Sequence, residues 1–174
     1  NMDAALLPDM LGYKDLAGAG LTRRQFERFL EAEEYERIAP GQFLRAGATD
    51  DTTAAWMAIV SKRPHATLCL LTALSIHDLT DEIPTRSNIA IPRGTKPLTI
   101  WSAPITWHHF DAATFDIGRT EYALPSGRTI GLYSAERTII DLFRLSHEWG
   151  SDLPIDALKR WLRVKGNSPS RLLT

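Results

Sequence analysis

The chain has 174 residues, of which 44% are hydrophobic and 24% are charged, and its formal net charge is −1. These values are typical of a soluble globular protein with one or two domains. A net charge so close to zero excludes a uniformly basic nucleic-acid-binding protein, so the distribution of charge along the chain matters more than the total.

The two ends of the chain differ in charge. Residues 1–47 carry six Lys/Arg and eight Asp/Glu, a net charge of −2, whereas residues 85–174 carry twelve and eight, a net charge of +4. DNA binding by the first region would therefore depend on a local patch of cations rather than on a basic domain.

Apolar runs and cysteine content bear on the cellular setting. No apolar run approaches the roughly 18 residues of a membrane span, and no signal peptide is evident, so we expect no membrane contact. Cys69 is the single cysteine, which excludes an intramolecular disulfide, and it lies in the apolar run "TLCLLTALSI". We therefore expect a buried structural thiol in a protein of the reducing cytoplasm.

The first 47 residues predict three short helices and a hairpin. The runs "DAALLPDML" and "YKDLAGAG" are each typical of a short helix, and a third helix is expected over Thr22–Ala32. Thr22 and Gln25 match the S/T-x-x-E/Q capping box, and Phe26, Phe29 and Leu30 form its apolar face. "YERI", a Pro-Gly turn and "QFLR" then predict two paired strands. This order is that of a winged helix-turn-helix domain over residues 1–47.

Residues 48–174 predict an α+β domain that follows a linker, "GATDDTT". Two apolar helices are expected near 53–62 and 67–79. Five β-branched and aromatic runs follow, which predict a four- or five-stranded, mainly antiparallel sheet: "SNIAIP", "LTIW", "ITWHHF", "TEYAL" and "RTIGLY". A helix capped by Ser134, a second that starts at Pro154, and the beginning of a third after Gly166 complete the domain.

With these elements the chain resembles the AbiEi family of antitoxins from type IV toxin–antitoxin systems. The resemblance covers nearly the whole length and depends on the order of three segments: "ERIAPGQFLR", "LLTALSIHDL" before "NIAIPRG", and "LYSAERTIIDLFR". It implies an N-terminal winged helix that binds the double-stranded operator DNA of its own operon. It also implies a C-terminal antitoxin domain that counters a nucleotidyltransferase-like toxin.

The third helix and the hairpin supply the candidate DNA-binding residues. The N-terminal half of a recognition helix meets base edges in helix-turn-helix docking, where Arg pairs with guanine and Gln with adenine. Like charges at i, i+4 repel each other, and a nearby polyanion would relieve the repulsion between Arg24 and Arg28. The candidates are Thr22, Arg23, Arg24, Gln25 and Arg28 on the helix, with Arg37 and Arg45 on the hairpin as phosphate contacts. A solvated helix with an Arg23–Glu27 pair is the alternative.

A basic stripe near the end of the chain is a second candidate DNA contact. Lys159, Arg160 and Arg163 fall together on the side of the helix opposite its apolar face. They could supply the nonspecific phosphate attraction that the acidic N-terminal region lacks, or they could form only the solvated face of an amphipathic helix.

Arg137, Asp141 and Arg144 share one face of the helix capped by Ser134. They form either a structural ladder of charges or a docking surface for the toxin or DNA, and the sequence leaves both open.

No cofactor, metal site or catalytic site is expected. The adjacent His108 and His109 would face opposite sides of a strand, and the remaining histidines lack ligands at zinc-site spacing. Phosphate-loop and nucleophile-elbow motifs are absent. We therefore expect a transcriptional repressor without enzymatic activity. Two alternatives remain: a metal-dependent nuclease-like enzyme using Asp116 and Glu121, and an antitoxin that acts through protein contacts without binding DNA.

Overall fold

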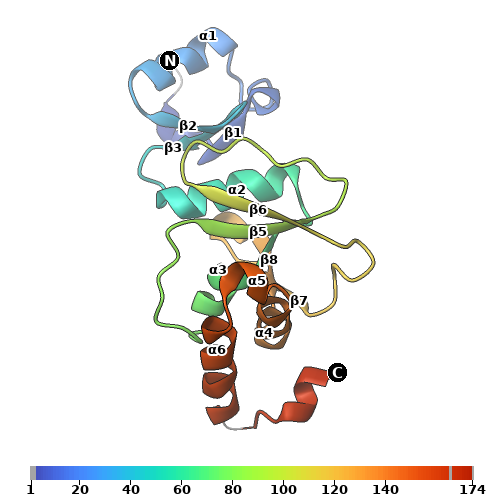
Figure 1. The fold of residues 1–174 in the computed structure, drawn as a ribbon. Helices are drawn as coiled ribbons and strands as arrows, with labels where there is room; N and C mark the ends of the chain where they lie inside the picture. The colour runs from blue at the N-terminus through green and yellow to red at the C-terminus, as the bar shows by residue number, and fades with distance from the viewer. Residues whose placement is uncertain (1–2, 165, 174) are drawn as a thin grey trace. The chain divides into compact units, whose positions relative to one another are not determined.

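The computed structural model describes residues 3–164 and 166–173 and forms two compact units (Figure 1). The first unit ends at Lys62 and also includes Leu98–Pro104, and the second contains Arg63–Pro97 and the chain from Ile105 onward. The first unit thus extends past residue 47, where the sequence predicted a domain boundary.

The first unit begins with two 3-10 turns and a strand rather than two helices. The elements are η1 (Ala4–Leu6), β1 (Met10–Gly12) and η2 (Tyr13–Asp15). Pro8 disfavours helical geometry at the residue before it, and the next residues gain partners by pairing with another strand, Leu11 opposite Phe43. Each predicted segment therefore contains a short 3-10 helix instead of an α-helix, and residues 10–12, which begin at the end of the first segment, form a strand because they pair with β3.

The third predicted helix and the hairpin are confirmed. Helix α1 (Arg23–Glu31) begins after the N-cap Thr22. Strands β2 (Tyr35–Ala39) and β3 (Gln42–Arg45) are antiparallel. The turn between them requires Gly41, whose φ of 69° lies in the left-handed region that glycine adopts without strain.

A small antiparallel sheet of order β1-β3-β2 supports α1, which lies over one of its faces in Figure 1. Phe26 of α1 is fully buried and makes edge-to-face contacts with the rings of Tyr35 and Phe43, at centroid distances of 5.6 and 4.8 Å. The rest of this core consists of leucines: Leu7, Leu11, Leu16 and Leu21. These buried contacts therefore hold α1 against the small sheet.

Helix α2 (Asp51–Lys62) and the segment Leu98–Pro104 complete the first unit. The Asp50 carboxylate caps α2 by accepting the Thr53 N–H at 2.9 Å, and its hydrogen bonds with Thr53 lower the pKa of Asp50. The buried Gln42 donates to the carbonyl of Ala58. The predicted strand "LTIW" lies in the second segment and is not a strand, although Trp101 N–H donates to the Ile38 carbonyl.

The second unit contains a five-stranded sheet of order β6-β5-β4-β8-β7. The strands are β4 (Thr67–Leu68), β5 (Ser87–Pro92), β6 (Ile105–Phe110), β7 (Arg119–Ala123) and β8 (Thr129–Tyr133). Pairs β4–β5 and β7–β8 are antiparallel, whereas β5–β6 and β4–β8 are parallel. The sheet is mixed rather than mainly antiparallel.

The central strand β4 was expected to be the first turn of a helix. Its two residues instead pair with β5 on one side and β8 on the other. The helix, α3 (Leu70–Ile76), starts only after Cys69. The apolar run "TLCLLTALSI" therefore serves as a buried strand followed by a buried helix, two uses that periodicity alone cannot separate.

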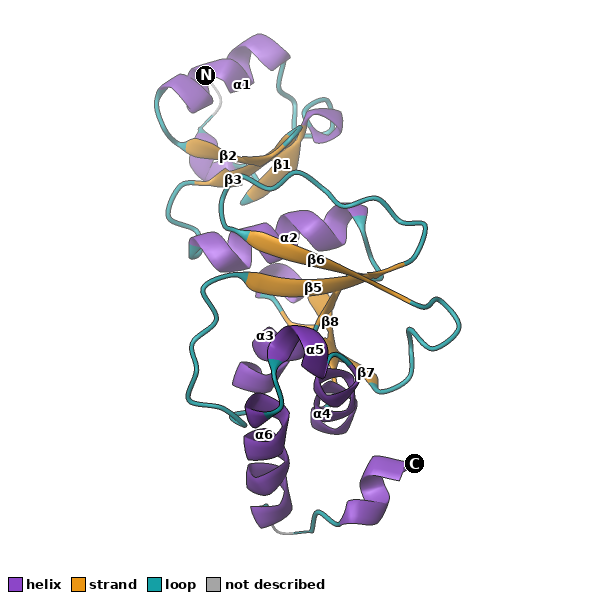
Figure 2. Cartoon of the chain, viewed as in Figure 1, coloured by secondary structure: helices purple, strands orange, loops and turns teal. Residues whose placement is uncertain are grey.

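Helices α4 (Ala135–Arg144), α5 (Ser146–Trp149) and α6 (Asp152–Arg163) follow the sheet, and η4 (Pro169–Leu173) is the last element. Ser134 caps α4 as predicted, since its Oγ accepts the Arg137 N–H at 3.1 Å. Figure 2 shows α3, α4 and α6 gathered on one side of the sheet. The core there contains Phe110, Tyr133, Leu142 and Trp161.

Two further expectations concern the single cysteine and the absence of a membrane span. Cys69 is completely buried in the core of the second unit, where burial raises the pKa of its thiol, as expected of a structural cysteine. Among the described helices, none combines the length and the apolar character needed to cross a membrane.

Candidate functional site

The N-terminal turn of α1 is fixed by a complete capping box. Thr22 Oγ1 accepts the Gln25 N–H at 3.1 Å, and Gln25 Oε1 accepts the Thr22 N–H at 2.9 Å. Gln25 was predicted to read adenine, which requires both ends of its amide. Its oxygen already accepts a backbone N–H here, so the structure gives Gln25 a capping role first.

Arg23 has partners within the first unit. Its Nε lies 3.9 Å from Glu27 Oε1, and its guanidinium carbon lies 4.3 Å from the centre of the Tyr13 ring. The ion pair is exposed and one turn apart, which is worth a few tenths of a kcal/mol. The Arg23–Glu27 pair considered as an alternative is therefore present.

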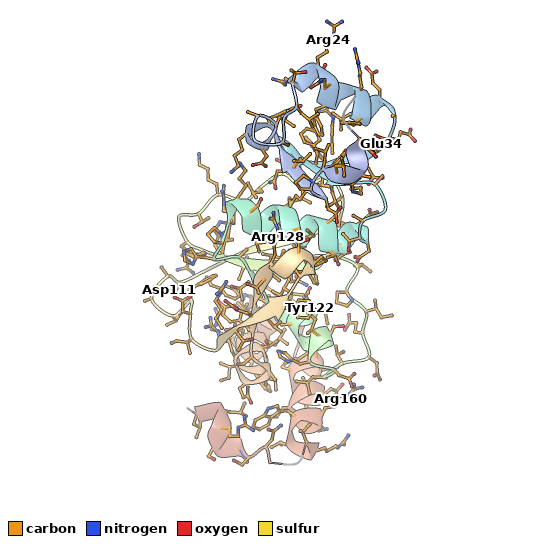
Figure 3. The ribbon with its side chains drawn as sticks, turned by 180° about the vertical axis from the view of Figure 1, so that it is seen from behind. Arg24, Glu34, Asp111, Tyr122, Arg128 and Arg160 are labelled. Carbon is orange, nitrogen blue, oxygen red and sulfur yellow. The ribbon has the colours of Figure 1, made fainter. Side chains whose placement is uncertain are left out.

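Arg24 and Arg28 differ from Arg23 in having no such partners. Both side chains are exposed, and Figure 3 shows Arg24 extending away from the ribbon. Within residues 3–164 and 166–173, no carboxylate or carbonyl pairs with either guanidinium. Two unpaired cations one helical turn apart thus stand on the exposed side of α1, opposite the buried Phe26.

The two hairpin arginines have different surroundings. Arg37 is exposed on β2, with its guanidinium carbon 5.4 Å from the centre of the Phe43 ring. Arg45, in contrast, is held by contacts with the N-terminal segment. It pairs with Asp9 at 2.8 Å and donates to the Leu7 carbonyl at 2.6 Å, and its bond to Asp9 raises its pKa. Arg45 therefore holds the N-terminal segment, and the phosphate contact at Arg45 stays a prediction.

The basic stripe on α6 is partly engaged as well. Arg160, labelled in Figure 3, pairs with Asp81 at 2.7 Å, and each partner shifts the pKa of the other in the direction that favours the ion pair. Lys159 and Arg163 are exposed. Two of the three predicted cations are thus available, since no described residue pairs with them.

Three of the five histidines make hydrogen bonds through their rings. His108 Nε2 lies 3.0 Å from Asn88 Oδ1, and His109 Nε2 lies 3.0 Å from the Thr95 carbonyl, so the neighbours bond in different directions as predicted. His77 Nε2 contacts the Tyr133 carbonyl at 2.8 Å. Among the described residues, no three His, Cys, Asp or Glu side chains are arranged to hold a metal ion.

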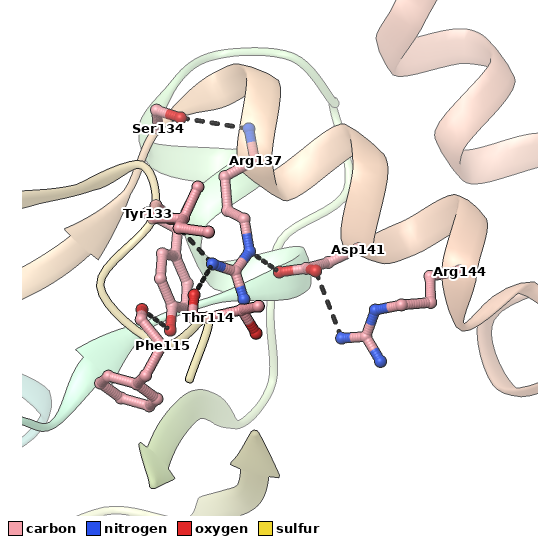
Figure 4. A network of polar contacts seen from close by, with 8 residues as sticks. Thr114, Phe115, Tyr133, Ser134, Arg137, Asp141 and Arg144 are labelled. Carbon is pink, nitrogen blue, oxygen red and sulfur yellow. Dashed lines mark hydrogen bonds and ion pairs between the residues drawn. The ribbon is translucent and has the colours of Figure 1, made fainter. Parts of the chain in front are cut away.

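Arg137, Asp141 and Arg144 form a ladder of ion pairs, drawn in Figure 4. Arg137 Nε donates to Asp141 Oδ2 at 2.9 Å, and Arg144 Nη2 donates to Asp141 Oδ1 at 3.2 Å. The Asp141 side chain is only 3% exposed. A buried carboxylate is costly unless it is paired with a cation. The two ion pairs show that this face forms the ladder of charges, one of the two possibilities that the sequence left open.

The same network also includes residues outside α4, in the loop before β7. Arg137 Nη1 donates to the carbonyls of Thr114 and Ile117 at 2.7 and 2.8 Å, which holds the loop before β7. Burial raises the pKa of Tyr133, whose protonated hydroxyl donates to the Phe115 carbonyl. The spacing i, i+4, i+7 predicted the ladder, but no sequence signal indicated its loop partners.

Comparison with known proteins adds no further identification. The chain matches no protein-family model and no curated protein. Its function is therefore inferred from the sequence pattern and from the geometry described above.

Proposed function

We propose that this protein is a double-stranded-DNA-binding transcriptional repressor that acts as the antitoxin of its own toxin–antitoxin operon. The observation that carries the proposal is the pair of exposed, unpaired arginines on α1, Arg24 and Arg28. Their mutual repulsion has no internal compensation among the described residues, and a row of phosphates and guanine edges would supply it.

One part of the first unit supports the proposed winged helix-turn-helix mode of binding, namely helix α1 with the hairpin that follows it. Helix α1 is capped at Thr22, rests on a three-stranded antiparallel sheet and is followed directly by the β2–β3 hairpin. In this mode α1 enters the major groove with its N-terminal half, and Arg37 of the hairpin contacts a phosphate. Arg24 and Arg28 would read bases, whereas Gln25 would keep the helix capped.

The antitoxin part of the proposal depends on the resemblance to the AbiEi family. A protein of this kind acts in the cytoplasm and has two partners, its own operator DNA and a nucleotidyltransferase-like toxin. No cofactor is required for either interaction.

Removing the two free arginines tests DNA binding. We expect Arg24→Ala/Arg28→Ala to weaken binding to the promoter of its own operon, by roughly 1–3 kcal/mol for each arginine that pairs with a guanine. The affinity would be measured by fluorescence anisotropy with the promoter fragment and with an unrelated fragment of equal length. Preference for the promoter should fall together with affinity, because base contacts carry the sequence information.

A matched control separates base contacts from the removal of charge. Arg93→Ala/Arg128→Ala removes two positive charges from the second unit and should retain the promoter preference. If Arg24→Ala/Arg28→Ala binds the promoter as tightly as the wild type while remaining folded, α1 is not the recognition helix.

We also propose that the protein is not an enzyme. The candidate nuclease carboxylates are exposed, Asp116 in the loop before β7 and Glu121 on β7. Incubation of the purified protein with DNA or RNA and Mg²⁺ or Mn²⁺ should leave the nucleic acid intact on a denaturing gel. Cleavage that Asp116→Ala or Glu121→Ala abolishes would identify a nuclease instead.

A further inference from the structure

A pocket of about 430 Å³ opens in the second unit beside the ion-pair ladder. It lies where the end of β6, the loop before β7 and helix α4 come together. The residues that matter for its chemistry are Arg93, Phe110, Asp111, Ile117, Ile140 and Arg144. Its volume lies within the range of small-molecule sites, roughly 300–1,000 Å³.

The charges around this pocket leave an excess of positive charge. Arg137 and Asp141 also line it, but they neutralise each other in a buried pair. Arg93, Arg144 and Asp111 line it too, so three arginines stand against two carboxylates, and one Asp111 oxygen accepts the Ala113 N–H at 3.0 Å. The pocket therefore favours an anion.

Arg144 is held in place for such a contact. Asp141 accepts one of its N–H groups, and its guanidinium carbon lies 5.2 Å from the centre of the Phe110 ring. The side chain is nevertheless 51% exposed. An arginine offers five N–H donors, so most remain available for a forked contact with a carboxylate or phosphate. Because the side chain is already oriented, binding would cost less conformational entropy.

The pocket also has an apolar wall that is open to solvent. Ile117 is 59% exposed and Ile140 is 43% exposed, although both are large hydrophobic residues. Both line the same pocket as the two arginines. Burial of such side chains by a ligand is favourable at about 25 cal/mol for each Å² of apolar surface.

We propose that this pocket binds a small organic anion in which a phosphate or carboxylate group is attached to an apolar body. The anionic group lies between Arg93 and Arg144, and the apolar body lies against Ile117 and Ile140. Asp141 is a positioning residue that orients Arg144. The site belongs to the second unit and is independent of DNA binding by α1.

Phenyl phosphate and benzoate test the proposal and distinguish the two anionic groups. In NMR titrations with labelled isoleucine methyl groups, at least one probe should give saturable shifts at Ile117 and Ile140. Phenol lacks the charge and inorganic phosphate lacks the apolar body, so both should bind more weakly than the better probe. Arg144→Ala should weaken the binding of that probe by about tenfold or more, as expected when charge-assisted hydrogen bonds are removed.

Two variants keep the test specific. Arg144→Lys retains the charge but not the fork and should bind with intermediate affinity, whereas Arg128→Ala should bind like the wild type. Promoter binding should be unchanged in Arg144→Ala. Failure of both anionic probes to give saturable shifts, equal binding of phenol, or unchanged affinity in Arg144→Ala would each overturn the proposal.

Discussion

The arginines of this protein differ in what their guanidinium groups contact. Arg137 and Arg45 donate to backbone carbonyls and pair with carboxylates, so they hold the chain together. Arg24 and Arg28 have no comparable partner in the described part of the chain. Helical spacing predicted the Arg137–Asp141 pair, but the partner of Arg45 lies 36 residues away in sequence, which no local pattern indicates.

His108 should make the stability of the protein depend on pH. Burial lowers the pKa of His108 and the neighbouring His109 adds to this, while Glu148 opposes it. Because the pKa is lower in the folded state, the unfolded state takes up the proton more readily. This stabilisation is fully present above the unfolded-state pKa of about 6.5 and is lost as the pH falls through the folded-state pKa.

Urea unfolding at about pH 7 and about pH 5 checks this prediction. The free energy of unfolding should fall more between these conditions in the wild type than in His108→Gln, which cannot acquire the charge. The exposed His147→Gln serves as the control and should behave like the wild type. An equal fall in His108→Gln would show that other groups cause the pH dependence.

Among the elements, those with strong local signals formed where they were predicted. Helix α1 has a capping box, α4 has a serine cap, and the β2–β3 hairpin has a Pro-Gly turn. The elements that were missed, β1 and β4, are strands of three and two residues whose partners are distant in sequence. Strands this short are stabilised by the neighbours they pair with, so the sequence alone does not reveal them.

Helix α6 allows a prediction about salt dependence. Since Arg160 pairs with Asp81, Lys159 and Arg163 are the two of the three predicted cations within Asp152–Arg163 that remain available for phosphate contacts. If both contact DNA, Lys159→Ala/Arg163→Ala should reduce the log–log slope of affinity against salt by up to about 1.8, at roughly 0.9 for each phosphate. Anisotropy titrations across a series of salt concentrations give this slope.

Promoter preference should persist in that variant, because Arg24 and Arg28 remain. Arg93→Ala/Arg128→Ala removes the same charge from elsewhere in the second unit and should leave the slope closer to that of the wild type. An unchanged slope in Lys159→Ala/Arg163→Ala would mean that α6 makes no phosphate contacts.

At the scale of the whole molecule, the largest difference from the sequence-based prediction is the boundary between the two units. Composition indicated a linker near residue 47, yet α2 and Leu98–Pro104 both belong to the first unit. The cause is burial and hydrogen bonding between distant residues: Gln42 bonds to Ala58, and Ile38 bonds to Trp101. Local composition indicates neither of these hydrogen bonds.

We therefore predict that residues 1–47 do not fold stably alone. This fragment lacks α2, whose residues 54–59 are buried, and it lacks the partner of the Ile38 carbonyl. Its amide NMR spectrum should be poorly dispersed and its thermal unfolding should lack a cooperative transition, in contrast to the full chain. A dispersed spectrum and a sharp transition for residues 1–47 would restore the boundary that the composition indicated.

The segment Leu98–Pro104 also has an evolutionary consequence. The first unit is completed by a stretch that the chain reaches only after it has built part of the second unit. A single recombination event after Lys62 would combine α1 and α2 of one protein with the Leu98–Pro104 segment of another. The two parts of the first unit would then come from different proteins. If α1 reads DNA as proposed, new specificities should therefore arise more readily by point substitution on α1 than by exchange of the whole N-terminal part of the gene.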